Sequence, residues 1–267
     1  MTAFAAHRPV AATHIGWRVA PPTSWEQRRM FERLAGKTVV LTREPADNAE
    51  LASRLRGRCA RIIEFSCVRT EPLTDTSGLA AELAALRDDD WLVVTSRHGA
   101  EAVARCGQPR AAVAAIGDAT AERLRAYGAR VAFQPSMSSG AALARELPHT
   151  SGVVLLARSD RALSDLPRVL HQRGFTVREV VAYRTVADAR GDVAAMQALL
   201  ASREPVAILF HSPSAVAGML AVIEAPLAVR AVIHVFGRST LRAVRDALGT
   251  AADVSLIEEE AAHVAHR

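Results

Sequence analysis

The chain has 267 residues, which is enough for one large domain or for two domains of about 100–130 residues each. Half of the residues are hydrophobic and only 4% are aromatic, so the composition supports a buried core and argues against a nucleic-acid binder that works by base stacking. The formal net charge of +5 attracts anions such as phosphates or polycarboxylates, but the basic residues are spread out, which argues against a dedicated DNA-binding arm.

The amino-terminal residues 1–35 carry no strand pattern, and we expect them to form a loose extension. His7, Arg8 and Arg18 interrupt any apolar core that a signal peptide would need. The three cysteines form no C-x-x-C pair, which favours reduced thiols. No apolar run reaches the roughly 18 residues that span a membrane. We therefore expect a cytoplasmic protein without a membrane anchor.

Short β-branched runs alternate with stretches rich in Ala, Leu and Arg. Almost all of these runs are continuously apolar, as in strands that are buried on both faces of a parallel sheet covered by helices. In chain order, the predicted strands are Thr38–Thr42, Arg61–Phe65, Trp91–Thr95, Ala112–Ile116, Arg130–Phe133, Val153–Ala157, Thr176–Val180, Val206–Phe210, Ala231–Phe236 and Asp253–Leu256. Usual sheet sizes then predict an α/β protein with two doubly wound parallel sheets of about five strands each.

The sequence also contains an internal repeat. Four segments recur in the same order, which predicts that the chain arose by duplication. The matching pairs are Val39–Arg43 with Val153–Arg158, Phe65–Thr70 with Val180–Thr185, Val93–Ser96 with Leu209–Ser212, and Ile116–Thr120 with Phe236–Thr240.

The repeat leaves two domain divisions open. The chain could divide sequentially near residue 150. It could also interleave, with residues 36–66 and 187–267 in one domain, 72–181 in the other, and 67–71 and 182–186 as linkers. Both linkers contain strand formers, so they could pair as a stiff hinge.

Hydroxyl groups and glycines follow several predicted strands at the start of a helix. Ser96 and Ser212 suit the N-cap position, and Ser214 follows a proline at the first helical position. The motifs Gly117-x-x-Thr120 and Gly237-x-x-Thr240 also open helices, where free backbone N–H groups and a glycine let a ligand approach. Since ligands bind at the carboxyl ends of parallel strands, these positions predict facing walls of a cleft rich in hydrogen-bond donors.

Three arginines stand at or after strand ends, namely Arg43, Arg97 and Arg158. An arginine at such a position can bind a carboxylate with two hydrogen bonds. Tyr183 lies in one linker, where its repeat partner is Val68. Because it breaks the symmetry between the repeats, Tyr183 is the candidate for a chemical group that acts from the junction.

Several common site motifs are missing from the sequence. There is no G-x-G-x-x-G, no G-x-x-x-x-G-K-[ST] and no G-x-S-x-G. The pair His263-x-x-His266 has helical spacing but lacks a third ligand. We therefore expect neither a nucleotide site nor a metal site.

Together these segments resemble the uroporphyrinogen-III synthase family, in family order from about residue 36 to about residue 250. The matching segments are Val39–Arg43, Trp91–Ala100, Ala114–Leu124, Val153–Asp160, Val180–Val186, Ala207–Val216 and Phe236–Val244. The resemblance implies two interleaved flavodoxin-like domains that are joined by a two-stranded linker.

The resemblance also implies a function. It implies an enzyme, a hydro-lyase, that closes hydroxymethylbilane to uroporphyrinogen III without a metal or cofactor. It implies that the key tyrosine is Tyr183 and that the hydroxyl contacts are Ser96, Thr120, Ser212 and Thr240. We therefore expect a monomer that binds this polycarboxylate and does not bind nucleic acid.

Two other functions are compatible with the same shape. One is a non-catalytic ligand-sensing module of this fold. The other is an extracytoplasmic solute-binding protein, which the missing export signal disfavours. The presence of Tyr183 and of both glycine–threonine motifs favours the enzyme.

Overall fold

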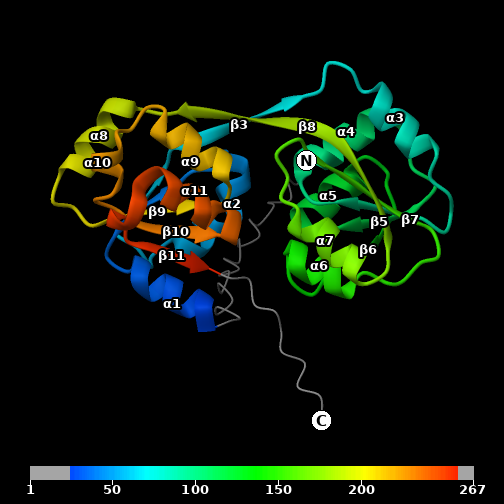
Figure 1. Cartoon of the computed structure of the whole chain (residues 1–267), viewed down its shortest axis with the longest axis horizontal. Coiled ribbons are helices and arrows are strands. Elements are labelled where there is room, and N and C mark those ends of the chain that lie inside the picture. The colour runs from blue at the N-terminus through cyan, green and yellow to red at the C-terminus, as the bar shows by residue number, and fades with distance from the viewer. Residues whose placement is uncertain (1–24, 258–267) are drawn as a thin grey trace, which may run out of the picture.

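The computed structural model describes residues 25–257, which form two lobes joined by a pair of long strands (Figure 1). The first lobe contains a five-stranded sheet in the order β11-β10-β9-β1-β2, and all of its strand pairs are parallel. Its strands are β1 (Thr38–Leu41), β2 (Arg61–Glu64), β9 (Val206–Phe210), β10 (Val232–Phe236) and β11 (Val254–Ile257).

The second lobe contains a six-stranded sheet in the order β3-β8-β7-β4-β5-β6. Its strand pairs are parallel except for β3 and β8, which run antiparallel. The strands are β3 (Ser66–Pro72), β4 (Trp91–Val94), β5 (Ala112–Ala115), β6 (Val131–Phe133), β7 (Val153–Ser159) and β8 (Thr176–Arg190).

Helices cover both faces of each sheet because alternate strand residues point to opposite faces. In the first lobe, Val39 and Leu41 pack with the α1–α2 side, whereas Val40 packs with the α8–α11 side. Helices of this lobe are α1 (Trp25–Leu34), α2 (Pro45–Leu55), α8 (Val193–Ala201), α9 (Pro213–Leu220), α10 (Ala225–Ala228) and α11 (Arg238–Leu248), followed by a 3₁₀ turn at Gly249–Ala251.

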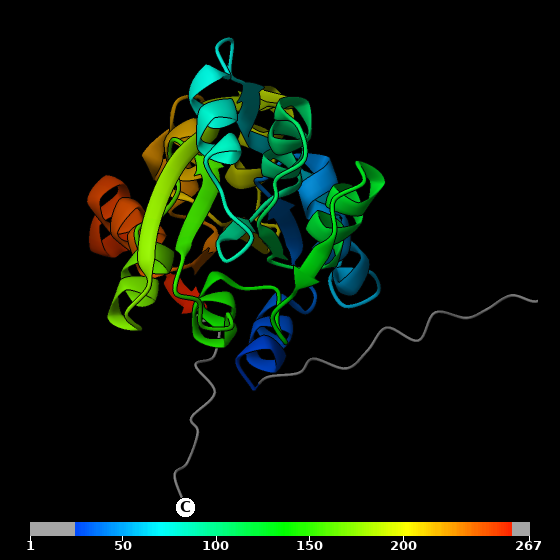
Figure 2. The same ribbon diagram turned by 90° about the vertical axis from the view of Figure 1, so that its right-hand side faces the viewer.

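The second lobe has the same construction. Leu92 and Val94 pack with one layer of helices and Val93 packs with the other, so the sheet is buried on both sides. Its helices are α3 (Ser77–Ala84), α4 (Arg97–Cys106), α5 (Asp118–Ala126), α6 (Gly140–Glu146) and α7 (Asp165–Gln172). Figure 2 shows the lobes along the axis that joins them, with helices on both sides of the sheets. The prediction of two doubly wound parallel sheets is confirmed.

The sheet orders explain the repeat. Written as β2-β1-β9-β10-β11 and β8-β7-β4-β5-β6, the parallel strands of the two sheets correspond position by position. Three of the four repeated segment pairs fall on strands that correspond in this way, namely β1 with β7, β9 with β4 and β10 with β5. The fourth pair, Phe65–Thr70 with Val180–Thr185, falls on β3 and β8, which pair with each other between the lobes. The first sheet combines segments from both ends of the chain, so the chain crosses between the lobes twice. We propose the interleaved boundaries given above for the two domains.

The crossing segments are the main difference from the predicted strands. The strand predicted at Thr176–Val180 continues to Arg190, and Ser66–Pro72 is a strand that the apolar pattern does not show. These two strands pair from Ser66 opposite Arg190 to Pro72 opposite Tyr183. Polar and charged residues interrupt both strands, and most of β8 is at least partly exposed, so neither strand has the continuous apolar signature of a buried strand.

Part of the predicted amino-terminal extension is a helix. Residues 25–34 form helix α1, and Met30, Phe31 and Leu34 are buried against the first sheet. The guanidinium groups of Arg54 and Arg58 lie 5.5 and 5.0 Å from the centre of the Phe31 ring. The expectation of a loose segment is therefore wrong for residues 25–34, because amphipathic burial holds that helix; residues 1–24 lie outside the described part of the chain.

Helix α9 packs directly beneath β3, and the contact depends on a missing side chain. A Cβ on Gly218 would stand well under 3.0 Å from the carbonyl oxygen of Cys67. No real Cβ contact is that short, so any larger residue must push α9 away from the strand that joins the lobes. Gly218 therefore sets the distance between this helix and the bridge.

We expect the substitution Gly218→Ala to lower the free energy of unfolding by about 1–3 kcal/mol, as overpacking does in well-packed cores. Urea unfolding followed by circular dichroism measures this change. Gly78→Ala in α3 is the matched control, because a Cβ there meets nothing within 4 Å. The control should leave stability unchanged or raise it by up to about 1 kcal/mol, since alanine is the better helix former. Equal stability of the two variants would contradict the role of Gly218.

Candidate functional site

Each sheet has one topological switch point, the place where strand order reverses. In the first sheet the reversal lies between β1 and β9, and in the second it lies between β4 and β7. Open α/β sheets bind ligands at the carboxyl ends of the strands beside such a reversal. Arg43 and Ser212 follow the first pair of strands, and Ser96 and Arg158 belong to the second.

The two carboxyl edges approach each other in the structure. Arg97, which begins α4 in the second lobe, bonds Asp47 of α2 in the first lobe, with 2.7 Å between Nη2 and Oδ1. Leu163 Cδ1, in the loop after β7, lies 3.9 Å from the place where a Cβ on Gly237 would stand. The loops after the strands of one sheet therefore contact the loops after the strands of the other.

Tyr183 lies at the end of the paired bridge and reaches the second switch point. Its hydroxyl oxygen accepts a hydrogen bond from Ser96 Oγ at 2.9 Å, while Ser96 Oγ also accepts the N–H of Gly99 as the N-cap of α4. Burial raises the pKa of Tyr183 above its ordinary value of 10.0, although the bond from Ser96 opposes the shift. The phenol is therefore protonated at neutral pH, and its own proton is not used in the bond with Ser96.

Asp47 is the centre of a group of charges between the lobes. Its carboxylate lies 2.7 Å from Arg97, 3.5 Å from His98 Nε2 and 3.9 Å from Arg43 Nη2. Burial by itself would raise the pKa of Asp47, but the bond with His98 and the two arginines outweigh it and hold the pKa well below 3.8. Asp47 is thus ionised at any pH at which the protein works.

Glu44 completes this group. One of its oxygens lies 3.1 Å from His98 Nε2, and the other accepts the backbone N–H of Thr70, in strand β3, at 3.2 Å. The hydrogen bond with Asp47 raises the pKa of His98 above 6.5, against the opposing effect of burial. Neither carboxylate nor the histidine stood among the predicted site residues. Their signal is an acidic pair just after β1 and a basic pair just after β4, but only the facing of the two edges joins these pairs.

The predicted arginines differ in what they can do. Arg43 is 40% exposed in its side chain and turns toward Asp47, so it keeps a face open to a ligand. Arg97 is already paired with Asp47 across the lobes. Arg158 is only 7% exposed and is bound to Glu179 at 3.0 Å and to the carbonyl of Leu163. A direct clamp on a substrate carboxylate therefore suits Arg43 best, and burial removes Arg158 from that task.

The hydroxyl and glycine positions also divide into two groups. Ser212 caps α9 by accepting the N–H of Ala215 at 3.2 Å, and Ser214 in its first turn is half-buried. Thr240 is fully buried, and its hydroxyl donates to the backbone carbonyl of Phe236, four residues earlier, at 3.2 Å. Thr120 is only 4% exposed. The hydroxyls of Thr120 and Thr240 therefore do not face a ligand, in contrast to the expectation, because the first helical turn carries them into the core.

The glycines that begin these two motifs differ, since Gly117 is buried and Gly237 is partly exposed. Gly237 has a φ of 94°, which favours glycine, and it stands opposite Leu163 of the other lobe. A Cβ on Gly117 would clash with Ser138, so that position is set by packing against the loop after β6. What the two motifs offer a ligand is thus the amide edge of α5 and α11.

His211 directly follows β9 beside this site. Its ring stacks on Phe236 with 4.0 Å between ring centres and 9° between planes. Burial lowers the pKa of His211 well below 6.5, and the nearby charge of Arg43 acts in the same direction. The ring is therefore neutral, and together with Phe236 it forms a flat apolar surface next to Arg43.

The carboxylates of Glu44 and Asp47 and the ring of His98 bring three potential ligand atoms within 4.8 Å of one another. The donor set does not fit a metal ion, because Arg97 and Arg43 already neutralise Asp47 and would repel a further cation. His263 and His266 lie outside the described residues. The absence of a resident metal therefore stays a prediction.

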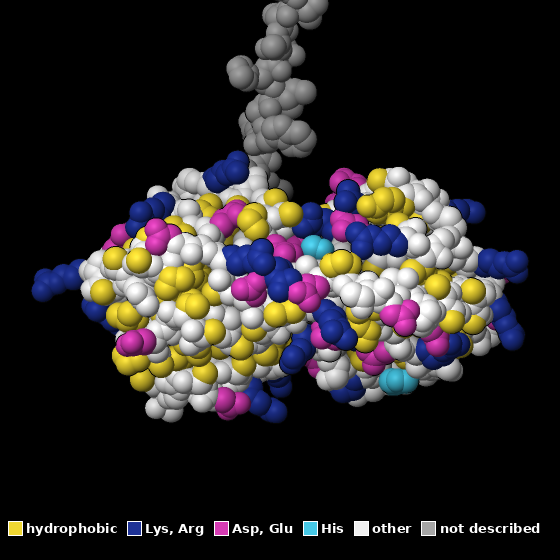
Figure 3. Space-filling view, turned by 90° about the horizontal axis from the view of Figure 1, so that it is seen from above, with side chains coloured by type: hydrophobic (Ala, Val, Ile, Leu, Met, Phe, Trp, Pro, Cys, Tyr) yellow, Lys and Arg dark blue, Asp and Glu magenta, His cyan; other side chains and the backbone are white. Residues whose placement is uncertain are grey.

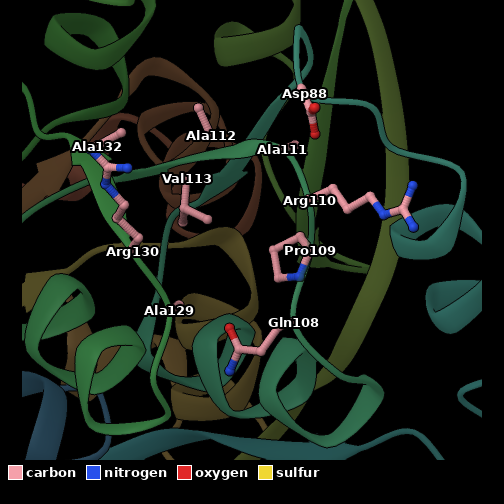
Figure 4. Close-up of a pocket in the computed structure, with 10 residues that line it drawn as sticks. All are labelled: Asp88, Gln108, Pro109, Arg110, Ala111, Ala112, Val113, Ala129, Arg130 and Ala132. Carbon is pink, nitrogen blue, oxygen red and sulfur yellow. The ribbon is translucent and has the colours of Figure 1, made fainter.

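A separate hollow of about 360 Å³ lies at the opposite, amino-terminal edge of β5 and β6 (Figure 4). Small alanines line its floor, and Arg110 and Arg130 lie on opposite sides of it. It contains none of the residues of the junction. The candidate site is therefore the inter-lobe edge and not this hollow.

The bond between Ser96 and Tyr183 is directly testable because the chain has only two tyrosines, Tyr127 and Tyr183. In a Tyr127→Phe background, the ultraviolet absorbance of phenolate reports Tyr183 alone. We expect Tyr183 to titrate above 10.0, and the added change Ser96→Ala to shift its pKa further upward, since the bond from Ser96 lowers it. Ser139→Ala, which removes the N-cap of α6, is the control and should leave the titration of Tyr183 unchanged. An unshifted pKa in Ser96→Ala would show that the bond is not formed.

Comparison with known proteins finds one matching family profile and several similar sequences. A sequence profile of the uroporphyrinogen-III synthase HemD family matches residues 49–260. The chain is 32% identical over 163 residues to the chloroplastic uroporphyrinogen-III synthase of Oryza sativa subsp. japonica, covering 55% of this chain and 53% of that protein. It is 28% identical over 163 residues to the uroporphyrinogen-III synthase of Synechococcus elongatus, covering 57% and 62%. The match thus spans little more than half the length of these curated relatives.

Among solved structures, a mutant uroporphyrinogen III synthase from the extremely thermophilic bacterium Thermus thermophilus is similar with a TM-score of 0.50. The two are 20% identical, and the alignment covers 84% of this chain and 94% of that one. At this identity the likeness supports the fold alone, and it agrees with the two sheets described above. The family profile covers most of the chain, including the β4–β7 switch point and the bridge, and it begins after β1. The chain therefore belongs to the uroporphyrinogen-III synthase family.

Proposed function

We propose that this protein closes hydroxymethylbilane to uroporphyrinogen III, with loss of water and inversion of the last ring. One observation supports this above all others, namely that Tyr183 stands at the junction between two switch points with its phenol protonated and its oxygen bound by Ser96. A flexible substrate that binds across the junction would meet strand-end groups from both lobes and one proton donor. The chain's membership of the family agrees with this chemistry.

The proposed substrate is a linear chain of four pyrroles that carries acetate and propionate arms and a terminal hydroxymethyl group. Tyr183 would donate its proton to the departing hydroxyl, so that water leaves and an azafulvene cation remains. The substituted carbon of the terminal pyrrole then attacks the carbon that lost the hydroxyl, and this bond gives a spiro intermediate. The intermediate breaks and recloses with the terminal ring inverted. The ring system loses one proton when it becomes aromatic again, and this proton restores the phenol.

Spontaneous closure gives the isomer without inversion, so the protein has to direct the position of attack. Holding a flexible chain in one bent arrangement is catalysis by positioning, which relies on surrounding walls and donors more than on strong acids. Arg43, the amide edges of α5 and α11 and the surface of His211 on Phe236 supply such contacts in the proposal. No electrons are transferred, so the reaction requires no redox cofactor.

Two finer statements belong to the same proposal. We propose a monomer, since the two lobes of a single chain provide both sides of the site, and a cytoplasmic location. Within residues 25–257, no helix has both the length and the apolar character needed to cross a bilayer. The alternative of a non-catalytic sensing module is disfavoured by the protonated Tyr183 at the junction.

The deciding experiment supplies purified full-length protein with freshly made hydroxymethylbilane and separates isomers I and III by chromatography after oxidation. We expect isomer III to dominate with the protein and isomer I to dominate without it. Formation of isomer I alone at the uncatalysed rate, by folded protein, would contradict the proposal and favour a sensing module.

The variant Tyr183→Phe tests the proton donor. We expect it to slow the formation of isomer III by at least about tenfold, because a positioned general acid contributes roughly 10²–10⁴-fold, while KM changes little. Tyr127→Phe is the matched control, since Tyr127 is 40% exposed at the end of α5 and should leave the rate unchanged. An unchanged rate in Tyr183→Phe would remove this residue from the mechanism.

A further inference from the structure

Away from the strand pair, one group of charged side chains connects the two lobes. Glu44 and Asp47 come from the first lobe, at the start of α2, and Arg97 and His98 come from the second, at the start of α4. All four side chains are between 16% and 28% exposed, so water screens them only in part. Seen from above, Figure 3 shows a histidine side chain at the seam between the lobes.

The geometry around His98 favours its charged form. Its Nε2 faces both Glu44 at 3.1 Å and Asp47 at 3.5 Å, and two carboxylates at these distances attract a positive charge on the ring. The other groups that face it are Arg97 on its own helix, whose charge opposes protonation, and Tyr183 from β8, which is neutral. Arg43 approaches the same Oδ2 of Asp47, at 3.9 Å, as Nε2 of His98 does. The attraction of the two carboxylates nevertheless outweighs the repulsion by Arg97 and raises the pKa of His98.

The same short segment also holds the proposed proton donor. The ring of His98 lies 5.7 Å from the ring of Tyr183 at a tilt of 46°, and Ser96 bonds the phenol oxygen. Residues 96–98 therefore contact Tyr183 on one side and Asp47 on the other. A separation of the lobes at Asp47 would leave Tyr183 in place on the second lobe and remove the strand ends of the first lobe from it.

We propose that Asp47 and His98, together with Glu44 and Arg97, form an inter-lobe latch that positions the strand ends of the first lobe against Tyr183. Asp47 and His98 are positioning residues in this proposal, since they act through the closure of the lobes. The catalytic consequence depends on the proposed function, whereas the closure itself does not.

The latch has a defined dependence on pH. The folded-state pKa of His98 is raised, so its contribution is fully present below 6.5 and is lost as the pH rises through the raised value. Asp47, with its lowered pKa, stays charged throughout that window. The latch should therefore hold the lobes most firmly at mildly acidic pH and should weaken on the alkaline side, where the pair of Arg97 with Asp47 remains.

Small-angle X-ray scattering of the full chain without substrate measures this directly, from about pH 5.5 to about pH 9 across the titration of histidine. We expect the radius of gyration of the wild type to rise with pH. Asp47→Asn should already be open at the acidic end, with an open-to-closed ratio at least about fivefold above that of the wild type, and His98→Gln should lose the pH dependence. Identical curves for Asp47→Asn and the wild type at every pH would overturn the latch.

Two further variants keep the result interpretable. Glu101→Gln removes a carboxylate from the same helix, α4, where it pairs with Arg123 of the same lobe, and it should scatter like the wild type. Asp47→Glu keeps the charge and should restore the closed form at acidic pH. If Asp47→Asn failed to fold by circular dichroism, His98→Gln would still decide the matter, because a wild-type pH response in that variant contradicts the proposal.

Kinetics then separate this proposal from the function. With hydroxymethylbilane, Asp47→Asn should lose rate at acidic pH, where the wild type is latched, and Asp47→Glu should recover it. If scattering shows that the wild type closes as the pH falls, but the protein makes no isomer III, the latch stands and the proposed function fails. If isomer III forms with no pH response in scattering, the function stands and the latch fails.

Discussion

The antiparallel pairing of β3 with β8 is the constraint on which the rest of the molecule depends. It runs from Ser66 opposite Arg190 to Pro72 opposite Tyr183, and both crossings of the chain between the sheets take place in it. Arg69 of β3 bonds Asp188 of β8, so an ion pair joins the two strands as well, and Glu71 and Arg190 extend this pair along their own strands. Figure 3 shows acidic and basic side chains close together over this bridge. A bridge of two hydrogen-bonded strands limits how the lobes can move, and its end determines where Tyr183 stands.

The duplication explains why the two lobes can face one another with equivalent edges. Corresponding strands occupy corresponding positions in each sheet, so both lobes present a switch point with the same kinds of groups. If the two repeats were identical, each lobe would offer the same half-site, and neither would have a chemical group that the other lacks. Tyr183, whose repeat partner is Val68, breaks that symmetry at the junction, and the proposed reaction needs one proton donor rather than two.

The charges at the junction serve both attraction and closure. Arg43, Arg97 and a protonated His98 outnumber Glu44 and Asp47 there, so the edge keeps a positive balance that suits a substrate with several carboxylates. Asp47 is nevertheless the one residue that both arginines and the histidine approach together. In the proposed mechanism, the same cations therefore hold the lobes together and leave Arg43 in part available to a ligand.

The amino-acid sequence alone predicts the two parallel sheets, the internal repeat and the candidate Tyr183, because buried parallel strands are continuously apolar and repeated segments can be aligned with each other directly. It predicted Ser96 at the N-cap of α4, since serine at a helix start has a local physical cause. It did not reveal the length of β8, the burial of Arg158 and Thr240, or the cluster of Asp47 with His98. Those features were decided only by the tertiary structure, because a half-exposed ladder has no apolar signature and because residues 47 and 98 become neighbours only when two separate lobes bring their carboxyl edges together.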